Sequence, residues 1–467
     1  MRTDLLNQDT IVALATPPGT GAIAVIRLSG QNVFELFSPL FSTEKGKFLD
    51  FGLINSHTIH LGYISDGSQQ LDQVLVSVFK GPHSYTGQNT LEVSCHGSRY
   101  IQQQLLELFI RVGARLAEPG EFTLRAFLNK KMDLVQAEAV ADLIASSTST
   151  SHQNALLQMR GGFSSKLSVL RTNLVDFAAL IELELDFSEE DVEFANRSDL
   201  RNLVEKIHKV ILRLIDSFHL GNVIKNGIQV AIVGRPNAGK STLLNQLLEE
   251  DRAIVSEIPG TTRDTIEDEV SIDGILFRFV DTAGIRTTAD EIEQMGVIRT
   301  FEKINNSTIV IYLFDIHELT NTSLQQELDQ LKTGLGEQSK LLVVGNKIDK
   351  EDLAYTKREF AAFADLLFIS AKEGFNIDQL RKRLVQLFDE MTTNVSETVV
   401  TNVRHVQSLN NAASALERVI EALDNKKTGE WVAFELKDAL HHLGLITGEV
   451  TGEEVLGSIF SKFCIGK

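Results

Sequence analysis

Hydrophobic residues follow two different periods along this chain. In the first third, short apolar runs are bounded by polar and glycine-rich turns, which is typical of strands. Strands are predicted over Ile11 to Ala15, Ala22 to Arg27, Thr58 to Ile64, Val74 to Phe79 and Thr90 to Ser94, with helices near 31–42 and 99–112. Residues 1–118 are therefore expected to form a small α/β domain. The polar segments Gly81 to Gly87 and His96-Gly97 are interpreted as turns.

Helical spacing takes over after Gly120. The stretch from Glu121 to Ile144 has no internal Gly or Pro, and two longer stretches repeat apolar residues at spacings of three and four. The two stripes are Phe163, Leu167, Leu170, Leu174, Phe177 and Ile181, and Leu200, Leu203, Ile207, Ile211, Leu214 and Phe218. They predict two helices that can pack antiparallel across the acidic run Glu182 to Glu193. For that run we favour a solvated loop over a metal site.

A third apolar stripe follows near the C-terminus. It consists of Val403, Val406, Leu409, Leu416, Ile420 and Leu423, and two further helices are predicted at Phe434 to Leu443 and Glu454 to Phe460. Because both helical halves are amphipathic, we predict one discontinuous helical domain, formed by residues 119–222 and 389–467. An α/β segment at residues 223–388 is then inserted in it.

The inserted segment opens with the apolar run Ile228 to Val233, the loop Gly234 to Ser241, and a helical stretch from Thr242. In this strand–loop–helix context GxxxxGK[ST] is a phosphate cradle, because glycines let backbone amides converge on phosphates. Lys240 reaches the outer phosphates, and the Ser241 hydroxyl can hold Mg²⁺. An ordinary glycine turn is the alternative for the loop alone.

Three more strand ends follow in the order that a guanine-nucleotide switch requires. They are Asp281-Thr282-Ala283-Gly284 after Leu276 to Val280, Asn346-Lys347-Ile348-Asp349 after Leu341 to Val344, and Ser370-Ala371-Lys372 after Leu366 to Ile369. The Asp349 carboxylate can accept hydrogen bonds from two guanine nitrogens, which the edge of adenine does not offer. Thr262 lies between loop and DTAG and can complete the Mg²⁺ shell. The joint order predicts a GTP-binding switch of doubly wound, Ras-like fold.

One residue departs from the Ras-type pattern. Ile285 follows Gly284, where Ras-type switches have the glutamine that orients the attacking water. The chain must therefore supply another water-positioning group and another positive charge beside the β- and γ-phosphates. The amide oxygen of Asn237 can help to hold a monovalent cation there, and the alternative is that Asn237 only stabilises the turn.

Composition and charge indicate the number of domains, the cellular compartment and the possible partners of this protein. The 467 residues suggest about three domains. Two cysteines, no signal-peptide pattern and no membrane-length apolar span lead us to expect a cytoplasmic protein. A net charge of −18 opposes non-specific attraction to nucleic acid, so any such contact must be local or shared. Cys464 lies four residues from the end, but Gly466 and Lys467 fit a prenylation signal poorly, and no membrane partner is expected.

Several motifs together resemble the MnmE (TrmE) family of tRNA-modification GTPases, over essentially the whole chain. They include Gly260-Thr261-Thr262-Arg263-Asp264, Ile285 after the DTAG, and the ending Phe463-Cys464-Ile465-Gly466-Lys467. The N-terminal motifs are Asp9 to Ala13, Ala15 to Gly19, Pro119 to Phe122 and Arg125 to Asn129. The resemblance implies a dimerising, formyl-tetrahydrofolate-binding N-terminal domain (1–118), a helical domain, and an inserted G domain.

The resemblance also implies a function with partners. Family members form homodimers and act with the FAD-containing protein MnmG, as a heterotetramer, on C5 of the wobble uridine (position 34) of certain tRNAs. They install aminomethyl or carboxymethylaminomethyl groups with a folate one-carbon donor, such as 5-formyl-tetrahydrofolate. Their G domains dimerise around K⁺, which activates GTP hydrolysis.

By motif, the resemblance assigns K⁺ to Asn237, Ser256, Ile258 and Thr261, Mg²⁺ to Ser241 and Thr262, and folate to Arg27, Glu92, Lys131 and Lys467. Glu293 takes the catalytic place of the missing glutamine; an exposed carboxylate at a helix start is the alternative. Cys464 is a functional thiol or a buried structural cysteine. The GTP-binding set is Asn237, Ala238, Gly239, Lys240, Ser241, Thr242, Ser256, Glu257, Ile258, Pro259, Gly260, Thr261, Thr262, Asp281, Thr282, Ala283, Gly284, Asn346, Lys347, Asp349, Ser370, Ala371 and Lys372.

Two other functions fit part of the sequence. A regulatory or ribosome-assembly GTPase would share the G domain, but not the N-terminal third or the Cys464 tail. A folate-binding scaffold with a vestigial switch is also possible, although no nucleotide motif is broken.

Overall fold

The computed structural model describes residues 9–186, 196–249, 268–280, 307–336, 339–350, 353–363, 365–392 and 399–466. The chain divides into two compact units. The first comprises residues 1–144, 156–208 and 411–467, and the second comprises 145–155 and 209–410. None of the helices in these described segments is long and apolar enough to cross a membrane.

The first unit contains a seven-stranded sheet of order β3-β4-β5-β6-β2-β1-β7. Its strands are β1 (Ile11–Leu14), β2 (Ile23–Ser29), β3 (Phe41–Thr43), β4 (Thr58–Asp66), β5 (Gln69–Phe79), β6 (Thr90–His96) and β7 (Arg115–Leu116). Neighbours are antiparallel except β1 and β7. The five predicted strands are confirmed, and the short β3 and β7 are additional.

Two helices cover one face of this sheet, and on the other face side chains of β4 and β5 are exposed. Along β5, Val74, Val76 and Val78 are buried in one core with α1 (Val33–Phe37) and α2 (Arg99–Arg111), whereas Leu75 points to the other face and is 46% exposed. A 3₁₀ turn, η1 (Ser38–Leu40), follows α1. The alternation follows from the two-residue period of a strand.

The helix predicted over Glu121 to Ile144 is in fact two helices, α3 (Glu121–Leu128) and α4 (Leu134–Ala145). Lys130 between them has a left-handed φ of 56°, which interrupts helical geometry. Asp133 and Gln136 exchange side-chain to backbone hydrogen bonds of 2.8 and 3.0 Å, which starts α4 with a capping box. Aspartate followed three residues later by glutamine was the sequence signal for this boundary.

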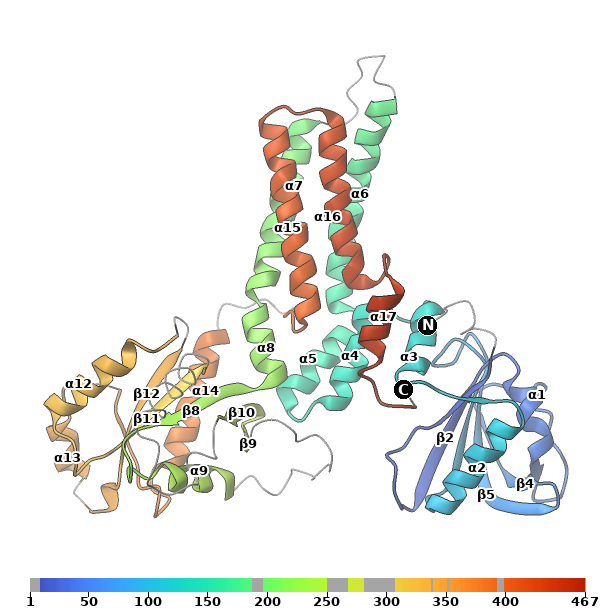
Figure 1. Cartoon of the computed structure of the whole chain (residues 1–467), viewed down its shortest axis with the longest axis horizontal. Coiled ribbons are helices and arrows are strands. Elements are labelled where there is room, and N and C mark those ends of the chain that lie inside the picture. The colour runs from blue at the N-terminus through green and yellow to red at the C-terminus, as the bar shows by residue number, and fades with distance from the viewer. Residues whose placement is uncertain are drawn as a thin grey trace. The chain divides into compact units, whose positions relative to one another are not determined.

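The remaining helices of the helical part are between 8 and 25 residues long. They are α5 (Ser149–Met159), α6 (Gly162–Asp186), α7 (Arg197–Asp216), α15 (Val403–Asp424), α16 (Gly429–Thr447) and α17 (Glu453–Phe460), of which α5, α7 and α15 have residues in both units. The predicted stripe on α6 is buried at Phe163, Leu167, Leu174 and Ile181. In the first unit α6 packs along α16, and α17 packs on α3 (Figure 1). Val403, the first residue of the third predicted stripe, is 56% exposed.

The second unit is built on a six-stranded sheet of order β13-β12-β11-β8-β10-β9. The strands are β8 (Ile228–Val233), β9 (Asp268–Ile272), β10 (Ile275–Phe279), β11 (Ile309–Asp315), β12 (Lys340–Asn346) and β13 (Leu367–Phe368); only β9 and β10 pair antiparallel. Its helical elements are α8 (Phe218–Asn226), α9 (Lys240–Glu249), α12 (Asn321–Lys332), η3 (Ile348–Lys350), α13 (Leu353–Glu359) and α14 (Ile377–Thr392).

Strand β11 is covered by helices on both faces of the sheet, as in a doubly wound fold. All seven of its residues are buried, with Ile309, Ile311 and Leu313 in a core that includes α9 and α14. Tyr312 and Phe314 lie in a second core with Leu324 and Leu328 of α12. A parallel strand covered on both faces has a continuous apolar sequence. The fold class predicted for this segment, a doubly wound P-loop domain, is confirmed.

Candidate functional site

The phosphate loop lies between the end of β8 and the start of α9, against the ends of β11 and β12. Gly234 has a φ of 148°, and a Cβ on it would lie 1.9 Å from the carbonyl oxygen of Leu313. Gly239 has a φ of 97°, and its Cβ would lie 2.3 Å from Nδ2 of Asn346. Only a residue without a Cβ can approach its neighbours so closely. Both glycines are therefore required for the loop to lie against the ends of β11 and β12.

Lys240 begins α9 and turns its ammonium group back into this loop. Its Nζ donates to the carbonyl oxygens of Gly234 at 2.9 Å and Arg235 at 2.8 Å. Burial lowers the pKa of Lys240 below its ordinary value of 10.5. The positive charge of Lys240 therefore lies within the phosphate loop, at the N-terminus of α9. Anions bind favourably at the N-terminus of a helix.

Asn346 joins the phosphate loop to the two predicted base-recognition segments. It is 3% exposed, its Nδ2 donates to the carbonyl oxygen of Ala238 at 2.7 Å, and its Oδ1 accepts from the Ala371 N–H at 2.9 Å. One amide side chain thus fixes three separate segments at the carboxyl ends of parallel strands, which is where ligands bind in open α/β sheets.

Asp349 and Ser370 make the next contact of this arrangement. The Ser370 hydroxyl donates to Asp349 Oδ1 at 2.6 Å and accepts from the Glu373 N–H at 3.2 Å. Ser370 is fully buried, and the side chain of Lys372 is 80% exposed beside Glu373. The serine thereby sets the orientation of the carboxylate predicted to read guanine.

A second acidic residue in this region was missed by sequence reasoning. Asp315, the last residue of β11, forms an ion pair of 2.6 Å with Lys347, whose φ of 71° is left-handed. Burial of Asp315 acts to raise its pKa, but the hydrogen bonds from Lys347 and from the His317 N–H outweigh it, so the pKa lies below its ordinary value of 3.8. The signal was an aspartate that ends a fully apolar run.

This ion pair predicts a dependence of stability on pH. Because the folded pKa of Asp315 is lowered, its stabilising contribution is complete above pH 3.8 and is lost as the pH falls through the folded value. We expect Asp315→Asn to make acid unfolding less steep when it is followed by far-ultraviolet circular dichroism. Asp329→Asn, an exposed carboxylate on α12, is the matched control and should titrate like the original chain. Equal curves for all three proteins would contradict the prediction.

In the first unit, the structure brings together two of the four predicted folate residues. Arg27 on β2 and Glu92 on β6 are register partners, and Glu92 Oε1 accepts from Arg27 Nε at 2.9 Å and Nη2 at 2.8 Å. Arg27 Nη1 donates to the carbonyl oxygen of Gly466 at 3.3 Å. Lys131 Nζ instead donates to the Pro82 carbonyl at 2.9 Å, and Cys464 is exposed.

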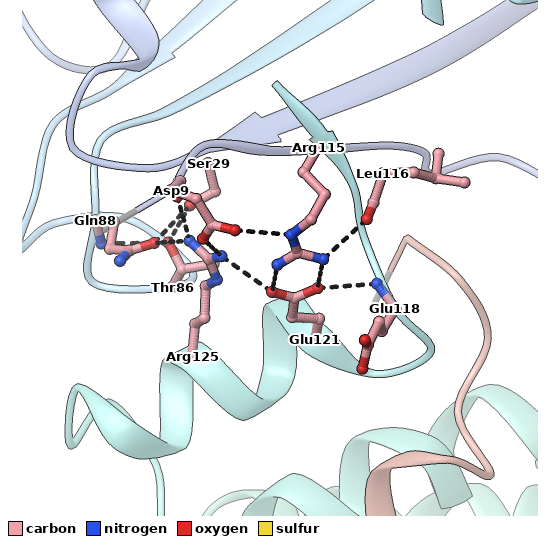
Figure 2. A network of polar contacts seen from close by, with 9 residues as sticks. All are labelled: Asp9, Ser29, Thr86, Gln88, Arg115, Leu116, Glu118, Glu121 and Arg125. Atoms are coloured by element: carbon pink, nitrogen blue, oxygen red, sulfur yellow. Dashed lines mark hydrogen bonds and ion pairs between the residues drawn. The ribbon is translucent and has the colours of Figure 1, made fainter. Parts of the chain in front are cut away.

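A buried ionic network lies beside these residues (Figure 2). Arg125 and Glu121 on α3 have no exposed side-chain surface, and Arg125 Nη2 donates to Glu121 Oε1 at 3.0 Å and to Asp9 Oδ1 at 2.5 Å. Arg115 donates to both Glu121 oxygens, at 2.6 and 3.1 Å, and to Asp9. Arg125 also donates to Gln88 Oε1 at 3.1 Å. Three of the four N-terminal motifs, those that contain Asp9, Glu121 and Arg125, therefore meet in one polar network.

Comparison with known proteins covers both units. The profile of the MnmE helical domain matches residues 134–464, and that of the GTP-binding protein TrmE N-terminus matches residues 10–131. A tRNA modification GTPase MnmE of Flavobacterium psychrophilum is 53% identical over 465 residues, covering 99% of this chain and 100% of the relative. One of Cytophaga hutchinsonii with the same name is 52% identical over 460 residues, covering 98% of each.

The chain belongs to the MnmE family of tRNA modification GTPases. Among solved structures, a GTP-binding protein of Sulfolobus solfataricus in complex with GDP is 20% identical, with a TM-score of 0.27, and covers 48% of this chain and 67% of its own.

Some of the predicted site residues lie outside the described residues. They are Ser256 to Thr262, Asp281 to Gly284, Glu293 and Lys467. Of the predicted cation ligands, Asn237 and Ser241 are described: Asn237 is exposed in the phosphate loop with a left-handed φ of 61°. An exposed amide and the first hydroxyl of α9 are donors that suit hard cations such as Mg²⁺ and K⁺.

Proposed function

We propose that this MnmE-family chain is a Mg²⁺-dependent, K⁺-stimulated GTPase whose hydrolysis cycle drives a conformational change needed for tRNA wobble-uridine modification. The observation that carries the nucleotide part is Asn346, which ties the phosphate loop to the guanine-reading segments. Lys240 would contact the phosphates, Asp349 would accept from guanine, and Ser370 to Lys372 would close over the base. Ser241 and Thr262 would hold Mg²⁺, which neutralises charge on the β- and γ-phosphates.

The cation that replaces an arginine finger is the next part of the proposal. Asn237, Ser256, Ile258 and Thr261 would hold K⁺ beside the phosphates, and Glu293 would orient the attacking water in place of the missing glutamine. The exposed position of Asn237 supports this assignment, because its amide oxygen lies at the loop surface rather than in the core.

The N-terminal part would bind a folate one-carbon donor and form the homodimer. Arg27, Glu92, Lys131 and Lys467 would hold 5-formyl-tetrahydrofolate or a related folate, with Cys464 nearby as a thiol. The exposed part of the sheet along β4 and β5 supports a dimer, because Leu61 and Leu75 are cross-strand partners that are 47% and 46% exposed.

The proposed domain boundaries follow the sequence. Residues 1–118 would be the folate-binding domain, 119–222 and 389–467 the helical domain, and 223–388 the G domain. The FAD-containing protein MnmG would join the homodimer as a heterotetramer, and the product would be aminomethyl or carboxymethylaminomethyl uridine at position 34.

Hydrolysis rates in two salts test the cation proposal. We expect GTP turnover to be at least about tenfold faster in K⁺ than in Na⁺, because an ion of the wrong size stabilises the transition state poorly. Glu293→Ala should lose turnover but still bind a fluorescent GTP analogue, whereas Glu359→Ala, an exposed glutamate on α13, should keep both. Equal rates in the two salts would reject the K⁺ site.

Mass spectrometry of wobble nucleosides tests the modification proposal. In cells that lack this protein, we expect loss of the C5 substituent from tRNA, restored by the full chain but not by one that lacks residues 464–467. Nucleosides unchanged by the loss would favour a regulatory GTPase instead.

A further inference from the structure

Arg27 is held by two aromatic rings, a carboxylate and a backbone carbonyl. Its Cζ lies 5.4 Å from the ring centroid of Tyr85 and 5.7 Å from that of Phe122. All three of its side-chain nitrogens donate within the protein, two to Glu92 Oε1 and one to the Gly466 carbonyl. A planar guanidinium suits such stacking, because aromatic faces attract cations.

The ring of Tyr85 is itself fixed from α3. Its hydroxyl exchanges a hydrogen bond of 2.8 Å with Thr123, which is fully buried. On either side of Tyr85, Asn129 Nδ2 donates to the Thr86 carbonyl at 2.7 Å and Lys131 Nζ to the Pro82 carbonyl at 2.9 Å. The segment between β5 and β6, interpreted from sequence as a turn, is thus anchored to α3 and to the residues that follow it.

These contacts have a consequence for Glu92. Because Nε and Nη2 of Arg27 both donate to Glu92 Oε1, the guanidinium sets the orientation of the Glu92 carboxylate. In the described residues, Glu92 Oε2 accepts no hydrogen bond from the protein, and the side chain is 29% exposed. That oxygen is therefore available to N–H donors of a ligand, such as those on the edge of a pterin ring.

We propose that Tyr85 is a positioning residue of the folate site: its ring and that of Phe122 hold Arg27 flat, and Arg27 in turn orients Glu92. The inference rests on the proposed folate site. Tyr85 acts through Arg27 and does not need to touch the ligand. Its aromatic face, rather than its hydroxyl, carries the effect.

Titration calorimetry of the full chain with 5-formyl-tetrahydrofolate tests this role. We expect Tyr85→Met, which keeps a long apolar side chain but removes the aromatic face, to raise Kd about tenfold or more. Tyr85→Phe keeps the face and should stay within about threefold of the original chain, as should Thr123→Val, which removes only the hydroxyl contact. Tyr100→Leu, an exposed tyrosine on α2, is the matched control and should leave Kd unchanged.

Rescue by phenylalanine separates positioning from simple packing. If Tyr85→Met lowers the melting temperature markedly, Tyr85→Leu is the second variant, with the same expected rise in Kd. A Kd unchanged in both Tyr85→Met and Tyr85→Leu would overturn the inference and leave the folate site standing. The same conclusion would follow if Tyr85→Phe bound the folate as weakly as Tyr85→Met. An original chain that does not bind the folate would overturn the folate site and the inference together.

Discussion

A Lys240→Ala chain should hydrolyse GTP at least about 100-fold more slowly than the original chain. The ammonium group lies within the phosphate loop, 2.9 and 2.8 Å from two loop carbonyls, so it is already placed where phosphates would enter. Removing one preorganised donor to developing charge typically costs a factor of about 100 to 1,000 in rate. Because burial already lowers the pKa of Lys240, binding an anion beside it also relieves an unfavourable buried charge.

Single-turnover hydrolysis at saturating GTP measures this effect apart from affinity. Lys332→Ala on α12 removes an exposed lysine from the same unit and should leave the rate unchanged. Lys240→Arg tests geometry, since a guanidinium is longer and planar and should not restore the rate. A Lys240→Ala chain that hydrolyses GTP normally would mean that the loop carbonyls, and not a nucleotide, are the partners of this lysine.

The nucleotide site was largely predictable because its determinants are local. Strand β8 has the predicted bounds, Ile228–Val233, and the glycines of the following loop adopt the left-handed angles that the motif requires. What sequence could not provide is the contact between segments. Asn346 reaches Ala238 across 108 residues, and that approach exists only because β8, β11 and β12 are neighbours in the sheet.

Other features were missed for identifiable physical reasons. Asp315 carries no motif, and its ion pair with Lys347 depends on the register of β11 and β12. The segment from Gly81 to Gly87 has turn composition, yet its position depends on hydrogen bonds with α3 and with the residues that follow α3, which sequence does not reveal. The interrupted helix at Lys130 was signalled only by a capping pair, which a count of apolar residues overlooks.

Arg125 is fully buried, although arginine side chains are normally exposed. We expect Arg125→Met to reduce the free energy of unfolding of the first unit by about 3–5 kcal/mol, the usual cost of removing one partner of a buried ion pair. The substitution leaves the fully buried carboxylate of Glu121 with Arg115 as its remaining guanidinium partner. It also removes the donor to Gln88 Oε1 and to the Asp9 backbone (Figure 2).

Urea unfolding followed by tryptophan fluorescence can measure this loss, because Trp431 is the only tryptophan and belongs to the first unit. Arg201→Met in the same unit is the matched control: it breaks the surface pairs with Asp424 and Glu205, which water solvates well, and should shift the midpoint little. Arg125→Lys keeps the charge but not the fork that contacts both carboxylates, so it should fall between Met and the original. Equal losses for Arg125→Met and Arg201→Met would mean that burial of the network adds nothing to its strength, and the N-terminal motifs would then need an explanation other than stability.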